Sequence, residues 1–354
     1  MTESMLTRNE IRDLLEALPR YKLSHLRTEL EEAHRLRAAL GPQSATAGKY
    51  AVPRILIKRD DTTGLAFGGN KGRHFEFETA HIISGGFDTV INVNHYHSNQ
   101  ARFIAAACAR AGLRYILVST DMTEAPLQGN LLLCKLMGAE IHRVAGSEGL
   151  AFARKLADGV RERGGKPYVV NDDTFPDMMG VIGFLECGYE LEAQLQEFGV
   201  DRDSIRVWGL SGRSIPGLRL YAKNRGLNWK ATAVTYSPAT TAQADEGMVR
   251  GAGLAARHLR LPNVLSPGDI DVLAAYAGPG YGIPYDGVFE AMHIVARTES
   301  LILDPNYTGK SMAALIGEIR RGAFAADDTV VFIHSGGMPQ VFAFAQQIWD
   351  WQPA

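Results

Sequence analysis

RILIKRDDTTGLAFGGNKGRHFEFETAHIISGG (54–86) contains one complete strand–loop–helix unit, and the rest of the chain repeats this pattern. Its first five residues, 54–58, form a short apolar run that predicts a strand. Residues 71–84 predict a helix, which Gly85 and Gly86 end. A loop rich in glycine and polar residues connects the two elements.

The loop of this unit places Gly68, Gly69 and Asn70 directly before Lys71. Glycine pairs let a backbone approach a ligand closely or adopt a positive φ. A lysine in this position is a candidate for three roles. It can grip a phosphate, form a Schiff base, or lie on a solvated helix end.

Short apolar runs alternate with longer amphipathic segments along the remaining chain. Further strands are expected at 88–93, 114–119, 139–144, 167–170, 205–210, 229–235, 300–304 and 328–333, with helices at 100–111, 130–137 and about 180–198 among the segments between them. Repeated βα units with nearly continuous apolar strands predict an α/β fold whose parallel sheets are covered on both faces. The 354 residues suffice for two such sheets. Ligands of such folds bind in loops at the carboxyl ends of strands.

The composition excludes several classes of protein. The formal net charge is −2, so we expect neither a nucleic-acid partner nor an anionic membrane surface. The three cysteines form no C-x-x-C pair and no disulfide framework, which indicates a reducing compartment. No signal peptide is evident, and no segment approaches the roughly 18 apolar residues of a membrane span. We therefore expect a soluble, cytoplasmic protein.

Three other loops between an expected strand and an expected helix hold glycine and polar groups: NHYHSNQ (94–100), GLSGRSIPG (209–217) and HSGGMP (334–339). The loop at 209–217 has the residues of a phosphate cradle, namely Ser211, Gly212, Arg213, Ser214 and Gly217. Free N–H groups and the positive end of the helix dipole favour an anion at such a helix start. A plain N-capped helix with a tight turn is the alternative interpretation.

Other nucleotide and metal chemistries fit the sequence less well. The spacing from Gly64 to Lys71 is near that of a P-loop, but Asn70 intrudes and Gly72 replaces the Ser or Thr that would bind magnesium. No expected strand is followed by G-x-G-x-x-G, and 209–213 lacks the last glycine of G-x-S-x-G. His95 and His97 alone make too small a ligand set, so we expect no metal. A lysine preceded by two glycines, a loop with the residues of a phosphate site and a helix that starts with Ser-Asn together fit pyridoxal phosphate.

Five segments resemble, in the same order, the D-cysteine desulfhydrase and 1-aminocyclopropane-1-carboxylate deaminase family. They are 57–77, HSNQAR (97–102), GNLLLCKLMGAE (129–140), 281–316 and VVFIHSGGMPQVFAF (330–344). The resemblance implies a pyridoxal-phosphate enzyme of the tryptophan-synthase-β fold, fold type II, with two three-layer αβα domains and mostly parallel sheets. The implied large domain spans 1–73 and 183–354, the small domain spans 74–182, and a homodimer is expected.

The resemblance also implies roles for individual residues. Lys71 resembles the Schiff-base lysine, with Asn70 as its cofactor-binding neighbour. Ser98 and Asn99, with the helix start at Gln100, match the pair that binds the substrate carboxylate and the cofactor's O3′. Two catalytic tyrosines are matched by Tyr281 and Tyr307, although both could instead be buried packing residues. Ser335 falls where a hydroxyl faces the pyridine nitrogen, which would leave that nitrogen largely unprotonated.

Departures from the family pattern concentrate near the substrate and the phosphate. The family continues the lysine motif with Thr and Lys, where this chain has Gly72 and His74. His97 takes the position of a glutamine and becomes an expected substrate contact. The phosphate loop reads Ser-Gly-Arg-Ser in place of a threonine-containing run. These changes leave the cofactor chemistry in place and put the usual substrate in doubt.

The implied activity is that of a deaminating α,β-lyase on a small amino acid, similar to D-cysteine desulfhydrase. In the deaminase branch a glutamate follows the tyrosine equivalent to Tyr307, and a leucine stands in place of Ser335. This chain has Thr308 and Ser335 at these two positions. Both favour the desulfhydrase-like branch. The alternatives are 1-aminocyclopropane-1-carboxylate deaminase, a sulfo-lyase acting on cysteate, and a paralogue that binds pyridoxal phosphate or another ligand without turnover.

Overall fold

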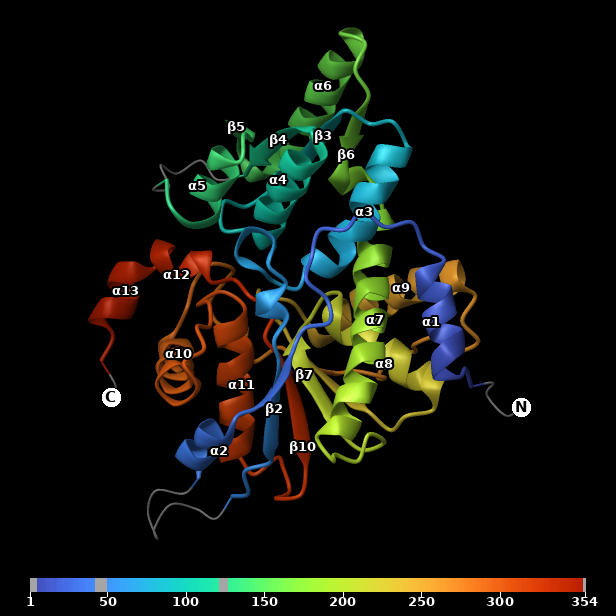
Figure 1. The fold of residues 1–354 in the computed structure, drawn as a ribbon. Coiled ribbons are helices and arrows are strands. Elements are labelled where there is room, and N and C mark those ends of the chain that lie inside the picture. The colour runs from blue at the N-terminus through green and yellow to red at the C-terminus, as the bar shows by residue number, and fades with distance from the viewer. Residues whose placement is uncertain (1–4, 42–49, 121–126, 353–354) are drawn as a thin grey trace.

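Two sheets organise the chain in the computed structural model, which describes residues 5–41, 50–120 and 127–352 (Figure 1). The larger sheet has the order β1-β2-β10-β7-β8-β9, with strands Leu30–Glu32, Arg54–Lys58, Thr329–Ile333, Arg206–Leu210, Lys230–Val234 and Asp271–Leu273. The smaller has the order β5-β4-β3-β6, with strands Glu140–Arg143, Arg114–Ser119, Thr89–Asn94 and Pro167–Val169. Every described pair is parallel except β1 with β2. The expected α/β fold with mostly parallel sheets is confirmed.

Alternate residues of each central strand enter opposite cores, so helices cover both faces of each sheet. In β10, Val331 and Ile333 belong to one core cluster, and Val330 and Phe332 belong to the other. One face of the larger sheet packs on α1 (Arg8–Glu16), α7 (Phe175–Glu197), α8 (Ser214–Arg225) and α9 (Thr241–Leu259), and the other packs on α2 (His34–Leu40), α10 (Asp286–Glu299) and α11 (Thr308–Arg320). Each sheet is therefore the middle layer of an αβα sandwich.

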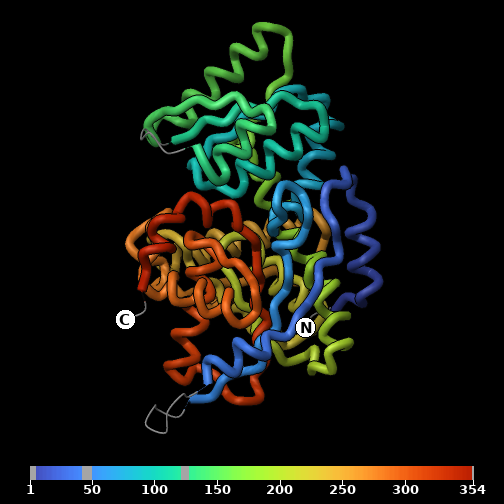
Figure 2. Tube along the Cα trace, turned by 60° about the vertical axis from the view of Figure 1, so that its left-hand side comes forward, coloured from blue at the N-terminus to red at the C-terminus, as the bar shows by residue number. Residues whose placement is uncertain are grey.

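The smaller sheet has the same construction. Its faces pack on α3 (Gly72–Ser84), α4 (Asn99–Ala111) and α5 (Gly129–Leu136) on one side and on α6 (Gly149–Glu162) on the other. Two short helices, α12 (Pro339–Ala343) and α13 (Ala345–Asp350), end the described chain. Figure 2 shows the smaller sheet and its helices as a lobe above the lobe of the larger sheet. The first and last parts of the described chain lie with the lower, larger lobe. None of the described helices is long and apolar enough to cross a membrane.

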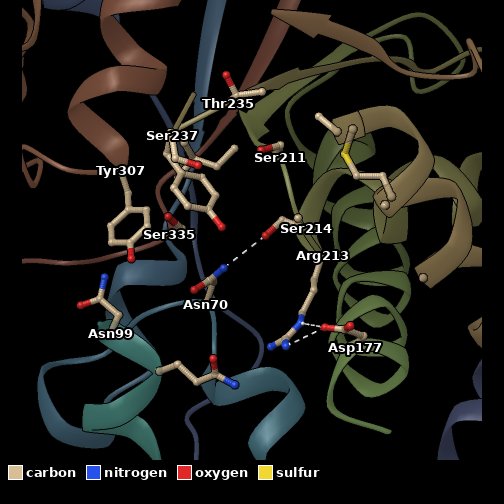
Figure 3. Close-up of a pocket in the computed structure, with 18 of the residues that line it drawn as sticks. Asn70, Asn99, Asp177, Ser211, Arg213, Ser214, Thr235, Ser237, Tyr307 and Ser335 are labelled. Carbon is tan, nitrogen blue, oxygen red and sulfur yellow. Dashed lines mark hydrogen bonds and ion pairs between the residues drawn. The ribbon is translucent and has the colours of Figure 1, made fainter. Parts of the chain in front are cut away.

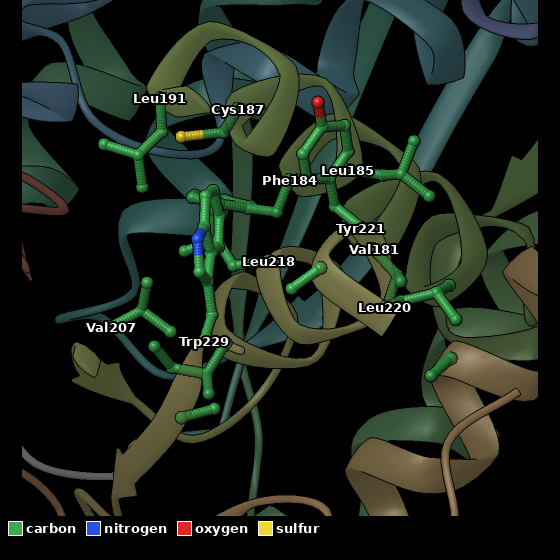
Figure 4. Close-up of a cluster of buried hydrophobic side chains, with 14 of the residues drawn as sticks. Val181, Phe184, Leu185, Cys187, Leu191, Val207, Leu218, Leu220, Tyr221 and Trp229 are labelled. Atoms are coloured by element: carbon green, nitrogen blue, oxygen red, sulfur yellow. The ribbon is translucent and has the colours of Figure 1, made fainter. Parts of the chain in front are cut away.

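Helices α7 and α8 pack closely because small residues face large ones. A Cβ on Gly217 would overlap the Cβ of Phe184, and a Cβ on Gly188 would lie 2.5 Å from the ring of Tyr221. Figure 4 shows Phe184 and Leu218 beside Trp229 in the core below these helices. Gly217 is thus a packing residue of α8, and its N–H donates to the Arg213 carbonyl.

The structure removes one expected strand and adds two short strands that were not expected. Residues 300–304 form no strand, although Leu301 and Leu303 are buried, because this apolar run packs against helices without a ladder partner. The strands β1 and β9, of three residues each, were not predicted because so short a run has no measurable periodicity.

The four strands of the smaller sheet all lie between residues 89 and 169, inside the expected small domain 74–182. Both expected boundaries fall within helices, at the first turn of α3 and in the middle of α7. The chain therefore passes between the lobes through continuous helices, and the exact boundaries stay a prediction.

Candidate active site

A cavity of about 640 Å³ opens between the two lobes. Loops after the carboxyl ends of β3, β7, β8 and β10 line it, together with the start of α3 and one side of α9. It contains most of the residues expected from the sequence, namely Asn70, Lys71, Ser98, Asn99, Gln100, Ser211, Gly212, Arg213, Ser214, Tyr281, Tyr307 and Ser335 (Figure 3). His97 and Gly217 are not among the lining residues.

Lys71 occupies the N-cap position of α3 and lines the cavity, directly after a loop whose two glycines have positive φ. Gly68 has φ +67°, and a Cβ there would overlap the Asp61 carbonyl oxygen. Gly69 has φ +132°, and the next N–H, of Asn70, donates to the Ser335 carbonyl oxygen over 3.0 Å. Burial, with Arg213 and Arg102 as neighbouring cations, lowers the pKa of Lys71 to about 7. A large share of this amine is therefore uncharged and nucleophilic at neutral pH.

A second glycine loop crosses the first. Gly336 and Gly337, after β10, have φ +90° and +101°, and a Cβ on Gly336 would lie 2.7 Å from the Cα of Gly69. Only glycine fits at such an approach. This crossing places Ser335 beside Asn70, on the wall of the cavity that Lys71 also lines.

The loop between β7 and α8 has the features of an anion site. Helix α8 begins at Ser214, whose Oγ accepts a hydrogen bond of 3.2 Å from Asn70 Nδ2. Gly212 has φ +126°, and the place of its missing Cβ is open space. The backbone here can approach an anion closely at the positive end of a helix dipole. The predicted cradle thus has the right geometry at residues 211–214, without Gly217.

Arg213 is fixed in this wall by partners on two helices. Its Nε and Nη2 donate to Asp177 Oδ1 of α7 over 3.1 and 2.8 Å, and its Nη1 lies 3.3 Å from Nε2 of His74. Burial and Arg213 lower the pKa of His74 well below 6.5, so this histidine is neutral and accepts the hydrogen bond. Asp177 was not predicted, because it joins the loop only through the packing of α7 on α8.

The start of α4 carries the expected Ser-Asn pair. Ser98 is the N-cap, and its Oγ accepts from the N–H groups of Gln100 and Ala101 over 3.1 and 3.4 Å. Asn99 Oδ1 accepts from Asn130 Nδ2 over 2.9 Å, which fixes the orientation of the amide. Gln100 lies on the cavity wall. The helix start therefore presents the positive end of its dipole to a carboxylate, which would take over N–H groups that now donate to Ser98 Oγ.

His97 occupies a different place from the one predicted. It is buried, and its ring stacks on Phe344 with centroids 4.9 Å apart, outside the cavity lining. His95 takes the position on the wall, with its ring edge-on to Tyr281 at 4.9 Å. Residues 96–97 form a turn, in which the Ser98 N–H donates to the His95 carbonyl oxygen over 2.9 Å, and this turn places the His97 ring against Phe344 and leaves His95 on the wall.

Tyr281 and Tyr307 meet on the wall of the cavity. Their hydroxyl oxygens are 2.5 Å apart, and the ring of Tyr236 lies 5.1 Å from that of Tyr307. Burial and the neighbouring tyrosines raise the pKa of Tyr307 well above 10, so its hydroxyl keeps its proton at neutral pH. The pair can therefore donate or relay a proton.

Two buried charges support these groups and were not predicted. Asp304 accepts the N–H groups of Asn306, Tyr307 and Thr308, each over 2.8 to 2.9 Å, and thereby shapes the turn that carries Tyr307. Arg102 donates to the carbonyl oxygens of Ala66 and Gly68 and so braces the lysine loop. A DPN turn was the only sequence signal for Asp304.

Comparison with known proteins agrees with this geometry. The profile of the family described as "Pyridoxal-phosphate dependent enzyme" matches residues 23–336. The chain belongs to this family of pyridoxal-phosphate-dependent enzymes.

Its relatives within the family include the 1-aminocyclopropane-1-carboxylate deaminases of Burkholderia vietnamiensis and Burkholderia ambifaria, each 32% identical over 94% of this chain and 98% of the relative. A crystal structure of an ACC deaminase homologue, 26% identical, superposes with a TM-score of 0.82 over 96% of this chain and 98% of that one. A threonine deaminase from Solanum lycopersicum, at 18% identity and a TM-score of 0.65 over 99% of this chain and 90% of its own, shares the fold. The expected family, fold type and cofactor are confirmed.

The residues present fit pyridoxal phosphate. A partly buried amine with a pKa near 7, an open glycine cradle at a helix start and the loop of Ser335 all border one cavity. When bound, the cofactor supplies an electron sink for a carbanion at the substrate α-carbon. Lys71 would hold its aldehyde carbon, and residues 211–214 would hold its phosphate.

Proposed function

We propose that this protein is a deaminating α,β-lyase of small amino acids, with a substrate similar to D-cysteine. The observation that supports it most is the placement of Lys71 in one cavity with the Tyr281–Tyr307 pair and the α4 helix start. D-Cysteine and one water would give pyruvate, hydrogen sulfide and ammonia.

The residues divide the work by their chemistry. N–H groups at the start of α4, oriented by Ser98 and Asn99, bind and orient the substrate carboxylate. Lys71 Nζ, with its lowered pKa, takes the proton from the α-carbon. Tyr307 keeps its hydroxyl proton at neutral pH, and the Tyr281–Tyr307 pair gives a proton to the leaving sulfur. The Ser335 hydroxyl, which lines the cavity, would hold the pyridine nitrogen of the cofactor and leave it largely unprotonated.

Thr308 supports the desulfhydrase-like reaction over ring opening. It is buried, its hydroxyl donates to Asp304 Oδ1 over 2.7 Å, and it does not line the cavity. This position thus offers no acidic group to a substrate β-carbon. 1-Aminocyclopropane-1-carboxylate deamination stays the second candidate, because the relatives at 32% identity carry that name.

Cysteate cleavage is less well supported by the wall around the phosphate loop. A sulfonate would need an uncompensated cation, whereas the guanidinium of Arg213 is paired with Asp177. The remaining alternative is that the protein binds pyridoxal phosphate or another ligand without turnover. This alternative is kept because the loops around His95 and Arg213 depart from the family pattern.

A substrate panel distinguishes these activities. The holoenzyme would be mixed with D- and L-cysteine, D- and L-serine, L-cysteate and 1-aminocyclopropane-1-carboxylate, and 2-oxo acid, ammonia, sulfide and sulfite would be measured. We expect 2-oxo acid and sulfide from D-cysteine and none from the Lys71→Ala variant. Faster turnover of the cyclopropane acid would favour the deaminase, and no 2-oxo acid from any compound would favour binding alone.

We also propose a homodimer. The exposed apolar side chains of Leu132 and Leu136 on α5, Phe342 on α12 and Trp349 on α13 support it, because they would be covered in an assembly. Sedimentation equilibrium of the wild type against a Leu136→Glu variant would test it. A monomeric wild type would contradict it.

A further inference from the structure

Lys310 is a fully buried cation with an unusual set of partners. It lies in the first turn of α11, three residues after Tyr307. Its Nζ donates to three backbone carbonyl oxygens, those of Tyr236 at 3.0 Å, Ala277 at 2.7 Å and Gly280 at 2.8 Å. Among the described side chains, no carboxylate forms an ion pair with it.

The three carbonyl groups come from two separate loops that border the cavity. Tyr236 follows β8 and lines the cavity, whereas Ala277 and Gly280 belong to the loop that ends at Tyr281. The same loop is also held by the isolated bridge from Gly280 to Ile283, by the Gly282 N–H, which donates to Asn306, and by the Tyr285 hydroxyl, which donates to the Tyr276 carbonyl oxygen. Lys310 holds the loop directly before Tyr281.

This geometry is that of a bound monovalent cation. Several carbonyl oxygens around one charge is how proteins bind potassium, and an ammonium group has three N–H donors for three such acceptors. The pKa of Lys310 falls to about 8 on burial, so the group still carries its charge and all three protons at pH 7.

We propose that Lys310 is a built-in monovalent cation that positions Tyr281 against Tyr307. It is a positioning residue, since it touches neither the cavity nor a reacting atom. Without it, the carbonyl groups of the two loops face a buried space with no donor, and the Tyr281 loop loses the two bonds that Lys310 makes to it from α11. Its catalytic part rests on the proposed function, in which Tyr281 acts on the leaving group.

The cation site can be tested without any enzyme activity. Lys310→Ala leaves a space lined by three carbonyl oxygens, whereas Lys310→Met fills that space with an uncharged chain. We expect the melting temperature of the Lys310→Ala holoenzyme to rise with potassium or ammonium chloride and not with choline chloride of equal ionic strength, because a bound ion stabilises the folded state. Lys310→Met, wild type and the exposed Lys230→Ala should show no such difference. Equal melting temperatures of Lys310→Ala in all three salts would overturn the cation site.

Activity then tests the link to Tyr281. A misplaced catalytic group costs roughly 10²-fold, so Lys310→Met should lower kcat by about ten- to a hundredfold with the cofactor absorbance retained. Potassium or ammonium should restore kcat of Lys310→Ala in a saturable way. The double variant Lys310→Met/Tyr281→Phe should be no slower than Tyr281→Phe alone. If the kcat losses of the two single variants multiply in the double variant, the positioning role is wrong. An inactive wild type, together with a melting temperature of Lys310→Ala that depends on the cation, would overturn only the proposed lyase function.

Discussion

At pH 7 the amine of Lys71 in the cofactor-free protein should react with an aldehyde far faster than an exposed lysine does. Burial beside Arg213 and Arg102 lowers its pKa from 10.5 to about 7. Roughly half of the Lys71 amines are then uncharged at pH 7, compared with about one in 3,000 for a lysine at its ordinary pKa. The rate of aldehyde capture should therefore rise with pH, reach half its maximum near pH 7 and level off above it.

Pyridoxal, which lacks the phosphate, is the suitable probe because its capture does not depend on the phosphate loop. Stopped-flow absorbance near about 410–420 nm would follow the covalent bond to lysine between pH 5.5 and 10. Lys71→Ala supplies the background from exposed lysines. Arg213→Gln removes a cation that disfavours the charged amine, so its midpoint should move upward, whereas the exposed Arg154→Gln should leave it unchanged. A wild-type midpoint near pH 10, or one that Arg213→Gln does not move, would refute the electrostatic argument.

Three further perturbations test other parts of the structure. The pKa of Glu190 is lowered from 4.5 to about 2 because Arg73 and Lys58 pair with it. The stabilisation that this carboxylate provides is therefore complete above pH 4.5 and is lost as the pH falls toward 2. Urea unfolding at a series of pH values should show this loss of stability, and the loss should be smaller in Glu190→Gln. Gly217→Ala should cost about 1–3 kcal/mol in thermal unfolding through overpacking against α7. Asp177→Asn should weaken cofactor binding roughly tenfold by loosening Arg213, measured by fluorescence titration, while pyridoxal capture keeps its maximal rate; an unchanged affinity would contradict the role of this ion pair.

Most of the architecture was predictable because it repeats a local pattern. Strands 54–58 and 114–119 were predicted to the residue, since each is an apolar run bounded by charged or turn residues. The run at 300–304 has the same composition but obtains its burial from helix packing, which no local pattern distinguishes. The three-residue strands β1 and β9 depend on their neighbours for their existence.

The site residues also fall into those that the sequence could predict and those that it could not. Residues in loops after strands, such as Lys71 and Ser211, could be found from the chain, because parallel strands bring such loops to one edge. Asp177 and His95 could not, since the packing of a distant helix or the turn at 96–97 decides which side chain reaches the wall. The same turn places the His97 ring against Phe344, outside the cavity lining.

The two helices that join the lobes, α3 and α7, pack side by side, and this has a mechanical consequence. If the small lobe rotates over a substrate, the helix pair is the hinge, because the chain between the lobes is continuous there. Lys71 lies at the base of that hinge and would scarcely move. Ser98 and Asn99 lie farther from it on α4 and would sweep through a longer arc toward Tyr281. Closure would thus bring the carboxylate site to a stationary lysine.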